Sequence, residues 1–324
     1  TASTPFQPAA DPAFAAQKSA QAAAAAPGAS PVIELRDLHK AYGPLEVIKG
    51  VSLSAPRGHV VTLIGSSGSG KSTLLRCCNL LESSQAGTIL FEGEPVRWTG
   101  PARERRPADR DQLRRIRTNL AMVFQQFNLW AHLTILQNVM EAPVTVLRQN
   151  PAQVEARARM LLAKVGIGDK ADAWPAQLSG GQQQRAAIAR TLMQGAEFIV
   201  ADEPIASLDP SSARRVMDIL ADLNRRDNIT VLVSLHQVEY TLRYCPRTIA
   251  LKAGEIVYDG PSRALTPEFL ASIYGAESED LFASIDAQPL PQDTEVRKPS
   301  AESSLVPFDL ARRGAAEQRP HLNA

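Results

Sequence analysis

A short glycine-rich segment constrains the fold of this chain more than any other feature. Residues 65–73 read GSSGSGKST and match the pattern GxxxxGK[ST]. The apolar run His59–Ile64 before it predicts a strand, and a helix is expected to begin near Lys71. Glycines let backbone N–H groups approach phosphate oxygens closely, and the helix N-terminus adds partial positive charge. The segment therefore predicts an α/β fold with a nucleoside triphosphate at a strand–loop–helix unit.

The residue types in this loop suit particular contacts with a triphosphate. Lys71 supplies a positive charge for the β- and γ-phosphates, and Ser72 offers a hydroxyl to Mg²⁺. The strand and helix around the loop argue against a chance glycine-rich turn, but the loop alone does not specify the reaction. The other residues expected around the phosphates are Gly65, Ser66, Ser67, Gly68, Ser69, Gly70 and Thr73.

Composition restricts the class of protein. Among 324 residues, 44% are hydrophobic and 21% are charged, which is typical of a soluble globular chain. The net charge of +1 gives no overall field that favours nucleic acid. Cys77, Cys78 and Cys245 lack metal-ligand spacing, so we expect buried, unpaired thiols in a reducing compartment. No apolar stretch approaches the ~20 residues that span a bilayer, and the alanine-rich start lacks the features of a secretory signal.

The pattern along the chain predicts one folded unit between two extensions. Residues 1–31 are expected to form a disordered Ala/Pro-rich leader, residues 32–275 the folded domain, and residues 276–324 a flexible tail. Alternating strands and helices imply a parallel sheet with flanking helices. Strands are expected at 32–38, 59–64, 88–91, 197–201 and 229–235, and helical patterns at 133–165, punctuated by Pro143 and Pro151, at 182–193 and at 211–223.

Residues 101–117 are polar and rich in arginine. A nucleic-acid-binding patch is one interpretation. Because Glu104, Asp109 and Asp111 interleave with the arginines and aromatic residues are absent, a solvated linker is favoured.

A second anion-binding helix start is predicted at residues 177–182, which read QLSGGQ. Ser179, Gly180 and Gly181 directly precede the helix expected from Gln182. A plain helix cap is the alternative, since this residue combination also suits that role.

Candidate catalytic groups follow two apolar strands. Asp202 and Glu203 come directly after the strand at 197–201, where Asp202 suits a Mg²⁺ shell and Glu203 can polarise an attacking water. His236 follows the strand at 229–235 and can hydrogen-bond a γ-phosphate. Singly, these could be ordinary surface acids and an unremarkable histidine. Their position at strand ends together with the phosphate loop favours the catalytic interpretation.

Taken together, these motifs resemble the nucleotide-binding subunits of ATP-binding cassette (ABC) transporters over about residues 32–275. The resemblance implies a P-loop NTPase fold of ABC ATPase type, with a mixed sheet core and an inserted helical subdomain at about 126–180. It also implies that Tyr42 stacks on adenine and that Gln125 touches Mg²⁺ and a transmembrane partner. Asp209 matches the D-loop, which reads Ser207-Leu208-Asp209.

The resemblance further implies a mechanism and partners. In a head-to-tail homodimer, residues 179–182 of one subunit close over the Mg-ATP held by the other. Glu203 acts as general base, while His236 and Lys71 stabilise charge on the γ-phosphate. Integral membrane permease subunits and, indirectly, a periplasmic solute-binding protein are the expected partners, with no nucleic acid. The subunit would lie peripherally on the cytoplasmic face of the inner membrane.

The resemblance gives two possible solutes. Residues 63–82 and 119–147 are similar to polar amino-acid importers of the histidine type. PIASLDP at 204–210 and SLHQVEYTLRYC at 234–245 are similar to phosphonate importers, which we favour. A non-transport ABC ATPase of DNA repair or translation would carry zinc modules, long coiled coils or tandem cassettes. A nucleotide kinase would leave residues 179–182 unexplained.

Overall fold

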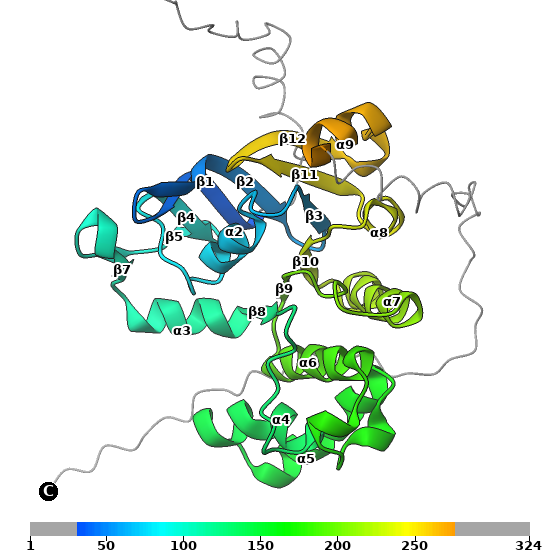
Figure 1. Cartoon of the computed structure of the whole chain (residues 1–324). Coiled ribbons are helices and arrows are strands. Elements are labelled where there is room, and N and C mark those ends of the chain that lie inside the picture. Colours follow the sequence, from blue (N-terminus) through cyan, green and yellow to red (C-terminus); the bar gives the residue numbers. More distant parts are fainter. Residues whose placement is uncertain (1–30, 276–324) are drawn as a thin grey trace, which may run out of the picture. The chain divides into compact units, whose positions relative to one another are not determined.

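Two β-sheets form the frame of the structure, a computed structural model that describes residues 31–275 (Figure 1). The larger sheet has the order β12-β11-β3-β10-β9-β8, in which only the β11–β12 pair is antiparallel. Its strands are β3 (Val60–Ile64), β8 (Leu120–Val123), β9 (Phe198–Ala201), β10 (Thr230–Ser234), β11 (Arg247–Lys252) and β12 (Glu255–Pro261). The predicted α/β class with a mixed sheet is therefore confirmed. The predicted leader and tail lie outside the described residues, except for Pro31.

The smaller sheet is antiparallel and has the order β2-β1-β4-β5. Its strands are β1 (Pro31–Tyr42), β2 (Leu45–Pro56), β4 (Ala86–Phe91) and β5 (Glu94–Pro95). The strand β2 was not expected from the sequence, and β1 runs to Tyr42, beyond the strand expected at 32–38. Both strands are irregular, with register shifts along the β1–β2 pairing, so strict alternation of apolar residues breaks down.

The central strands of the larger sheet are buried on both faces, which explains their uninterrupted apolar sequences. In β9, Phe198 and Val200 join one core, and Ile199 and Ala201 join the other. The first core contains α2 (Lys71–Cys78) and residues of the smaller sheet. The second contains residues of α6 (Gly180–Gln194) and α7 (Pro210–Asp227). The helices α2 and α6 thus pack on opposite faces of the sheet.

The helical pattern predicted at 133–165 is confirmed. It consists of α4 (Ile135–Glu141), a π-helical turn (Ala142–Val146) and α5 (Pro151–Lys164), which pack against α6 below the sheet in Figure 1. Pro143 does not end the helical path but lies inside the π turn. Because buried residues of α4, α5 and α6 share one core with β9 and β10, the subdomain boundaries near 126 and 180 remain a prediction.

A third core lies beneath the two last helices, α8 (Val238–Tyr244) and α9 (Pro267–Tyr274). Within the described part of the chain, no helix is long and apolar enough to cross a bilayer. The three cysteines are buried and unpaired, as predicted. Burial raises the pKa of Cys77 and of Cys245 to about 12, which keeps these thiols protonated and unreactive.

The predicted linker at 101–117 is wrong, because this segment is ordered. It contains β7 (Arg106–Pro107), which pairs with β6 (Trp98–Thr99), and α3 (Arg110–Asn119). The Asp109 carboxylate caps α3 by accepting hydrogen bonds from the backbone N–H groups of Asp111 and Gln112, at 2.9 and 3.0 Å. On the inner side, Ile116 is buried. An N-cap and a single apolar stripe are enough to form the helix despite its many arginines.

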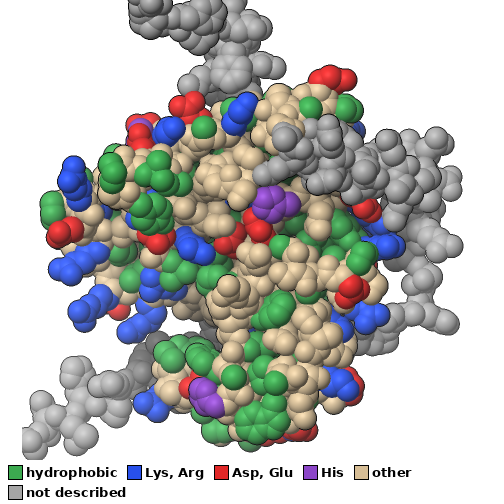
Figure 2. Space-filling model, in the orientation of Figure 1, with side chains coloured by type: hydrophobic (Ala, Val, Ile, Leu, Met, Phe, Trp, Pro, Cys, Tyr) green, Lys and Arg blue, Asp and Glu red, His purple; other side chains and the backbone are tan. Residues whose placement is uncertain are grey.

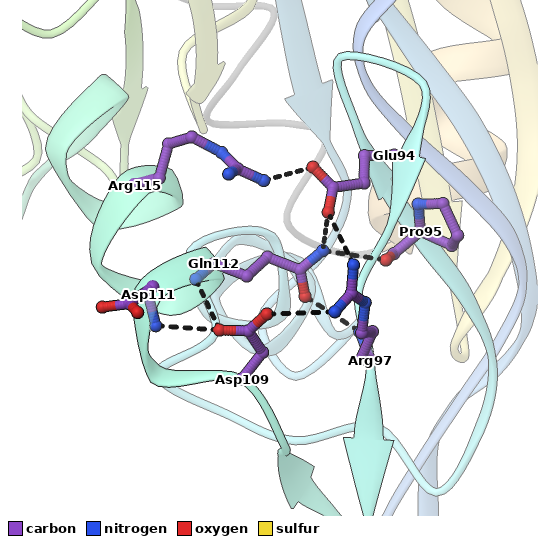
Figure 3. Close-up of polar contacts among 7 residues, drawn as sticks. All are labelled: Glu94, Pro95, Arg97, Asp109, Asp111, Gln112 and Arg115. Carbon is purple, nitrogen blue, oxygen red and sulfur yellow. Dashed lines mark hydrogen bonds and ion pairs between the residues drawn. The ribbon is translucent and has the colours of Figure 1, made fainter.

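Gln112 and Arg115 hold this segment to β5, as Figure 3 shows. Gln112 Nε2 donates to Glu94 Oε1 at 2.8 Å and to the carbonyl of Pro95 at 3.0 Å, and Arg115 also pairs with Glu94. Arg97 joins the network through Asp109 at 3.2 Å. Exposed arginines face outward, and Figure 2 shows Lys and Arg side chains gathered on the side where Figure 1 places β7 and α3.

The two sheets are fastened at the amino ends of β3 and β9. Arg57 pairs with Glu92, which follows β4, and with Glu197, which precedes β9, the latter at 2.6 Å. Close by, the N–H of Gly58 donates to Thr230 Oγ1 at 2.8 Å. These contacts join the start of the larger sheet to the end of a strand in the smaller one.

Candidate functional site

The phosphate loop lies between β3 and α2, as predicted. Gly65 has φ 149° and Gly70 has φ 105°, both in the region that favours glycine. A Cβ at Gly65 would lie 2.3 Å from the carbonyl oxygen of Leu251, so only glycine fits there. Gly70 is the N-cap residue of α2, which directs the helix N-terminus into the loop. Around these glycines, Ser67 and Gly68 are exposed, Ser66 and Thr73 are half-buried, and Ser69 is buried.

The Lys71 side chain lies inside the loop. Its Nζ donates to the carbonyl oxygens of Gly65 at 2.7 Å and Ser66 at 3.1 Å, and the residue is 4% exposed. The ammonium group is therefore placed by the same backbone that would surround a phosphate.

Ser72 and Asp202 are brought into direct contact. Ser72 Oγ donates to Asp202 Oδ1 at 2.8 Å, although Ser72 lies in the first turn of α2 and Asp202 follows β9. Asp202 is 5% exposed, and its backbone N–H donates to the carbonyl of Val123 at 2.8 Å, at the end of β8. A hydroxyl and a carboxylate side by side are hard oxygen donors, so the pair fits Mg²⁺.

Ser234, which the sequence analysis did not single out, connects the two acids. Its Oγ donates to Asp202 Oδ1 at 3.1 Å and accepts a hydrogen bond from the Glu203 backbone N–H at 2.9 Å. Ser234 ends β10, next to β9 in the sheet. Ser234 is a small polar residue in a buried strand, and it lies two residues before His236. These two features were the signals in the sequence that could have identified it as part of the site.

Glu203 and His236 form a close pair at the same edge. His236 Nε2 lies 2.5 Å from Glu203 Oε1. The hydrogen bond from His236 lowers the pKa of Glu203, more than burial raises it, so this carboxyl is ionised at neutral pH. Glu203 has φ 46°, a left-handed backbone that turns the carboxylate out of the line of β9. The structure thus brings together the predicted base and the predicted histidine.

Tyr42 lies at the end of β1, and the residue is 44% exposed. Burial raises the pKa of the Tyr42 hydroxyl, while a hydrogen bond with Thr73 lowers it by less. Thr73 is the last residue of the phosphate-loop motif. The predicted base-stacking residue and the phosphate loop are therefore neighbours. Gln125 is exposed in the turn just after β8, two residues beyond the carbonyl that bonds to Asp202.

Residues 179–182 form a helix start apart from the phosphate loop. Ser179 and Gln182 cap α6 reciprocally, with Ser179 N–H donating to Gln182 Oε1 at 2.9 Å. Ser179 is exposed, and Gly180 is half-buried at the first position of α6. Gly181 packs tightly on Ser212 of α7. Gly180 also faces the side chains of Leu208 and Phe127. The reciprocal cap on α6 shows that the plain helix cap is part of what this motif does.

Asp209 caps the neighbouring helix α7. Its Oδ1 accepts from the backbone N–H groups of Ser211 and Ser212, both at 3.0 Å, and from Ser211 Oγ at 2.7 Å. Hydrogen bonds from these two serines hold the pKa of Asp209 far below its usual range. The carboxylate is therefore exposed and ionised at neutral pH, and Ser212, which it caps, packs against Gly181 at the start of α6.

Comparison with known proteins identifies the family. A family model described as ABC transporter matches residues 48–206. The chain is 47% identical over 233 residues to the octopine permease ATP-binding protein P of Rhizobium radiobacter, covering 72% of this chain and 88% of that protein. It is 46% identical over 259 residues to the phosphonates import ATP-binding protein PhnC of Caulobacter vibrioides, covering 78% and 96%. The chain belongs to the ABC transporter ATP-binding family.

Solved structures agree with this assignment. The dimeric post-hydrolysis structure of the ATP-binding cassette MJ0796 with ADP and Pi is 33% identical, with a TM-score of 0.63, and covers 72% of this chain and 100% of that one. CbiO1 of Clostridium perfringens, part of an ABC transporter complex, has a TM-score of 0.64 at 25% identity and covers 72% and 90%. This ABC protein is therefore an ATP-binding ATPase with the P-loop fold that the sequence predicted.

Proposed function

We propose that this ABC ATPase energises solute import by hydrolysing Mg-ATP at the carboxyl edge of its larger sheet. The observation that carries the proposal is the continuous set of contacts from Ser72 through Asp202 and Ser234 to Glu203, and from Glu203 to His236. These contacts support a cation-binding role for Ser72 and Asp202 beside an ionised Glu203 carboxylate.

Each side chain has a task in this proposal. Lys71 and the loop N–H groups hold the β- and γ-phosphates, and Tyr42 stacks on the adenine. Glu203 orients the attacking water and accepts its proton, while His236 stabilises the γ-phosphate charge. Ser72 and Asp202 would hold Mg²⁺, with Gln125 as a further oxygen donor, and the bound ion would neutralise phosphate charge.

The exposed position of Ser179, at the start of residues 179–182, supports a head-to-tail dimer. Ser179–Gln182 would close over the nucleotide of a second copy, with Asp209 near the same surface. The dimeric cassette similar to this chain supports such an arrangement.

Import also requires membrane partners. The relatives named as permease and import ATP-binding proteins support an association with integral membrane permease subunits, and indirectly with a periplasmic solute-binding protein. Such an association would hold the subunit peripherally at the cytoplasmic face of the inner membrane.

Phosphonates are the favoured solute. The phosphonate import relatives support this, because their similarity covers 96% of one protein and 98% of another. The octopine permease relative, at 47% identity, supports the second candidate, a polar amino-acid importer.

Growth of a strain that lacks the chain tests the solute. Complementation with the natural sequence should restore growth on a phosphonate as sole phosphorus source, whereas the Glu203→Gln variant should not. Restored uptake of octopine or histidine without any phosphonate uptake would favour the second candidate. ATPase activity stimulated by DNA, without association with a permease, would contradict transport altogether.

A further inference from the structure

The end of β1 is fastened to the segment that follows α2. The side chain of Gln85 pairs with the backbone of Ala41 in both directions, with Ala41 N–H donating at 2.8 Å and Gln85 Nε2 donating to the Ala41 carbonyl at 3.1 Å. The backbone N–H of Gln85 donates to the carbonyl of His39 at 2.8 Å. This side chain therefore fixes the backbone next to Tyr42.

Lys40 is held by the same segment. Its Nζ lies 2.8 Å from Glu82 Oε2 and donates to the carbonyl of Ser83 at 2.9 Å. The ammonium also lies over the Tyr42 ring, 4.7 Å from the centroid. Lys40 is only 7% exposed. Lysine is rarely buried unless its charge is paired, so the ammonium has a defined position between two oxygens and the ring.

We infer that Lys40 is a positioning residue that holds the Tyr42 ring for the base of the nucleotide. This inference rests on the proposed role of Tyr42 in stacking on adenine. Because the ammonium lies over one face of the ring, a base can stack only on the other. Tyr42 is 44% exposed, which leaves area for that contact. A cation over an aromatic face attracts it, and more strongly when the cation is desolvated.

The contacts of Lys40 also set the distance between the base and the phosphates. The phosphate loop leads into α2, and Glu82 follows shortly after that helix. Glu82 and Ser83 hold Lys40, which lies against Tyr42. The Tyr42 hydroxyl in turn interacts with Thr73 in the first turn of α2. The ring is thus tied at its face and its hydroxyl to the element that begins at the phosphates, which preorganises the site.

A Lys40→Met substitution in the full chain tests the inference, because it keeps a long unbranched side chain and removes the charge. We expect KM for ATP to rise about three- to tenfold with kcat unchanged. A rise of this size corresponds to the loss of one partly desolvated cation–ring contact. Affinity for tripolyphosphate, measured by calorimetry, should not change, because this ligand has no base. Lys40→Arg should recover much of the ATP affinity. Lys49→Met, at an exposed lysine on β2, should behave as the natural sequence does.

The double variant with Tyr42→Ala separates this inference from the proposed function. Tyr42→Ala should itself raise KM for ATP, and Lys40→Met should then add nothing further. If Tyr42→Ala leaves KM unchanged, the stacking role of Tyr42 fails, and the inference fails with it. If Tyr42→Ala raises KM but Lys40→Met does not, only the inference is overturned. A parallel loss of tripolyphosphate affinity in Lys40→Met would mean that Lys40 merely stabilises the fold, which also overturns it.

Discussion

At the scale of single residues, the site depends on how Glu203 is presented. A left-handed backbone turns it out of β9, the Ser234 hydroxyl accepts from its N–H, and His236 lies against its carboxylate. These contacts come from the last residue of β10 and from His236, two residues after it, so the orientation of Glu203 is fixed by the neighbouring strand.

Replacing Glu203 by Gln should separate binding from turnover. The amide has the same shape but cannot accept a proton, so ATP affinity should be retained while kcat falls by about 10²–10⁴. Single-turnover phosphate release and calorimetric ATP titration measure the two quantities. Normal phosphate release from this variant would refute the general-base role.

Removing His236 should alter the pH dependence of hydrolysis. The hydrogen bond from His236 lowers the pKa of Glu203, so in His236→Ala this pKa should rise. The base must be ionised to act. As the solution is acidified, the variant should therefore lose activity at a higher pH than the natural sequence does. The pH profile of kcat/KM for ATP in both proteins measures this, since ATP ionisation affects them equally. An unshifted acid limb would show that Glu203 is not the group that titrates.

Residues that belong to a sequence motif could be predicted, whereas residues that hold other side chains in place could not. The phosphate loop, both acids and His236 lie where the pattern placed them. Ser234 and Lys40 were not identified, because each depends on a contact between segments distant in sequence. Lys40 contacts Glu82, and Ser234 contacts Asp202. No local spacing signals such a pair.

At the scale of elements, α6 and α7 meet with little space between them. A Cβ at Gly181 would lie 2.5 Å from Ser212 Oγ and 2.6 Å from Ser212 Cβ. The contact between Gly181 and Ser212 therefore sets the spacing between the starts of α6 and α7, whose N-cap residues are Ser179 and Asp209.

A Gly181→Ala substitution should force these helix starts apart. Overpacking of this kind costs about 1–3 kcal/mol in the free energy of unfolding, which a urea titration would detect. Ser212→Gly removes the opposing Cβ, so the double variant should recover part of that stability. An unfolding midpoint unchanged in Gly181→Ala would contradict the tight packing.

Secondary structure was predictable where the period was clear. The strand and helix patterns at 197–201, 211–223 and 229–235 agree with β9, α7 and β10 to within a few residues. The helix α3 was missed because its arginines outnumber its apolar residues. Its order comes from Asp109 and from contacts with β5, which lies several residues earlier in the chain.

At the scale of the whole molecule, the exposed position of Ser179 leads to a prediction about assembly. With ATP, the Glu203→Gln variant should form a dimer, since it binds nucleotide without hydrolysing it. Light scattering after size-exclusion chromatography measures the mass. Adding Ser179→Arg should abolish the dimer, because a bulky charge would enter the closing surface.

The matched control for assembly is Ala156→Arg, at an exposed position on α5. This variant should dimerise as its parent does. Equal loss of the dimer in both arginine variants, or a monomer throughout with ATP, would contradict the proposed arrangement.

Arg57 has a consequence for how the molecule can deform. Its guanidinium joins Glu92 and Glu197 at the amino ends of β3 and β9, while the phosphate loop, Glu203 and His236 lie at the opposite, carboxyl ends. The smaller sheet is held at that opposite end as well, because the backbone N–H of Lys49 in β2 donates to the carbonyl of Gly254, between β11 and β12, at 2.9 Å. Attachments at both ends leave the two sheets little freedom to rotate against each other, so the phosphate loop would move together with both sheets in any change of conformation.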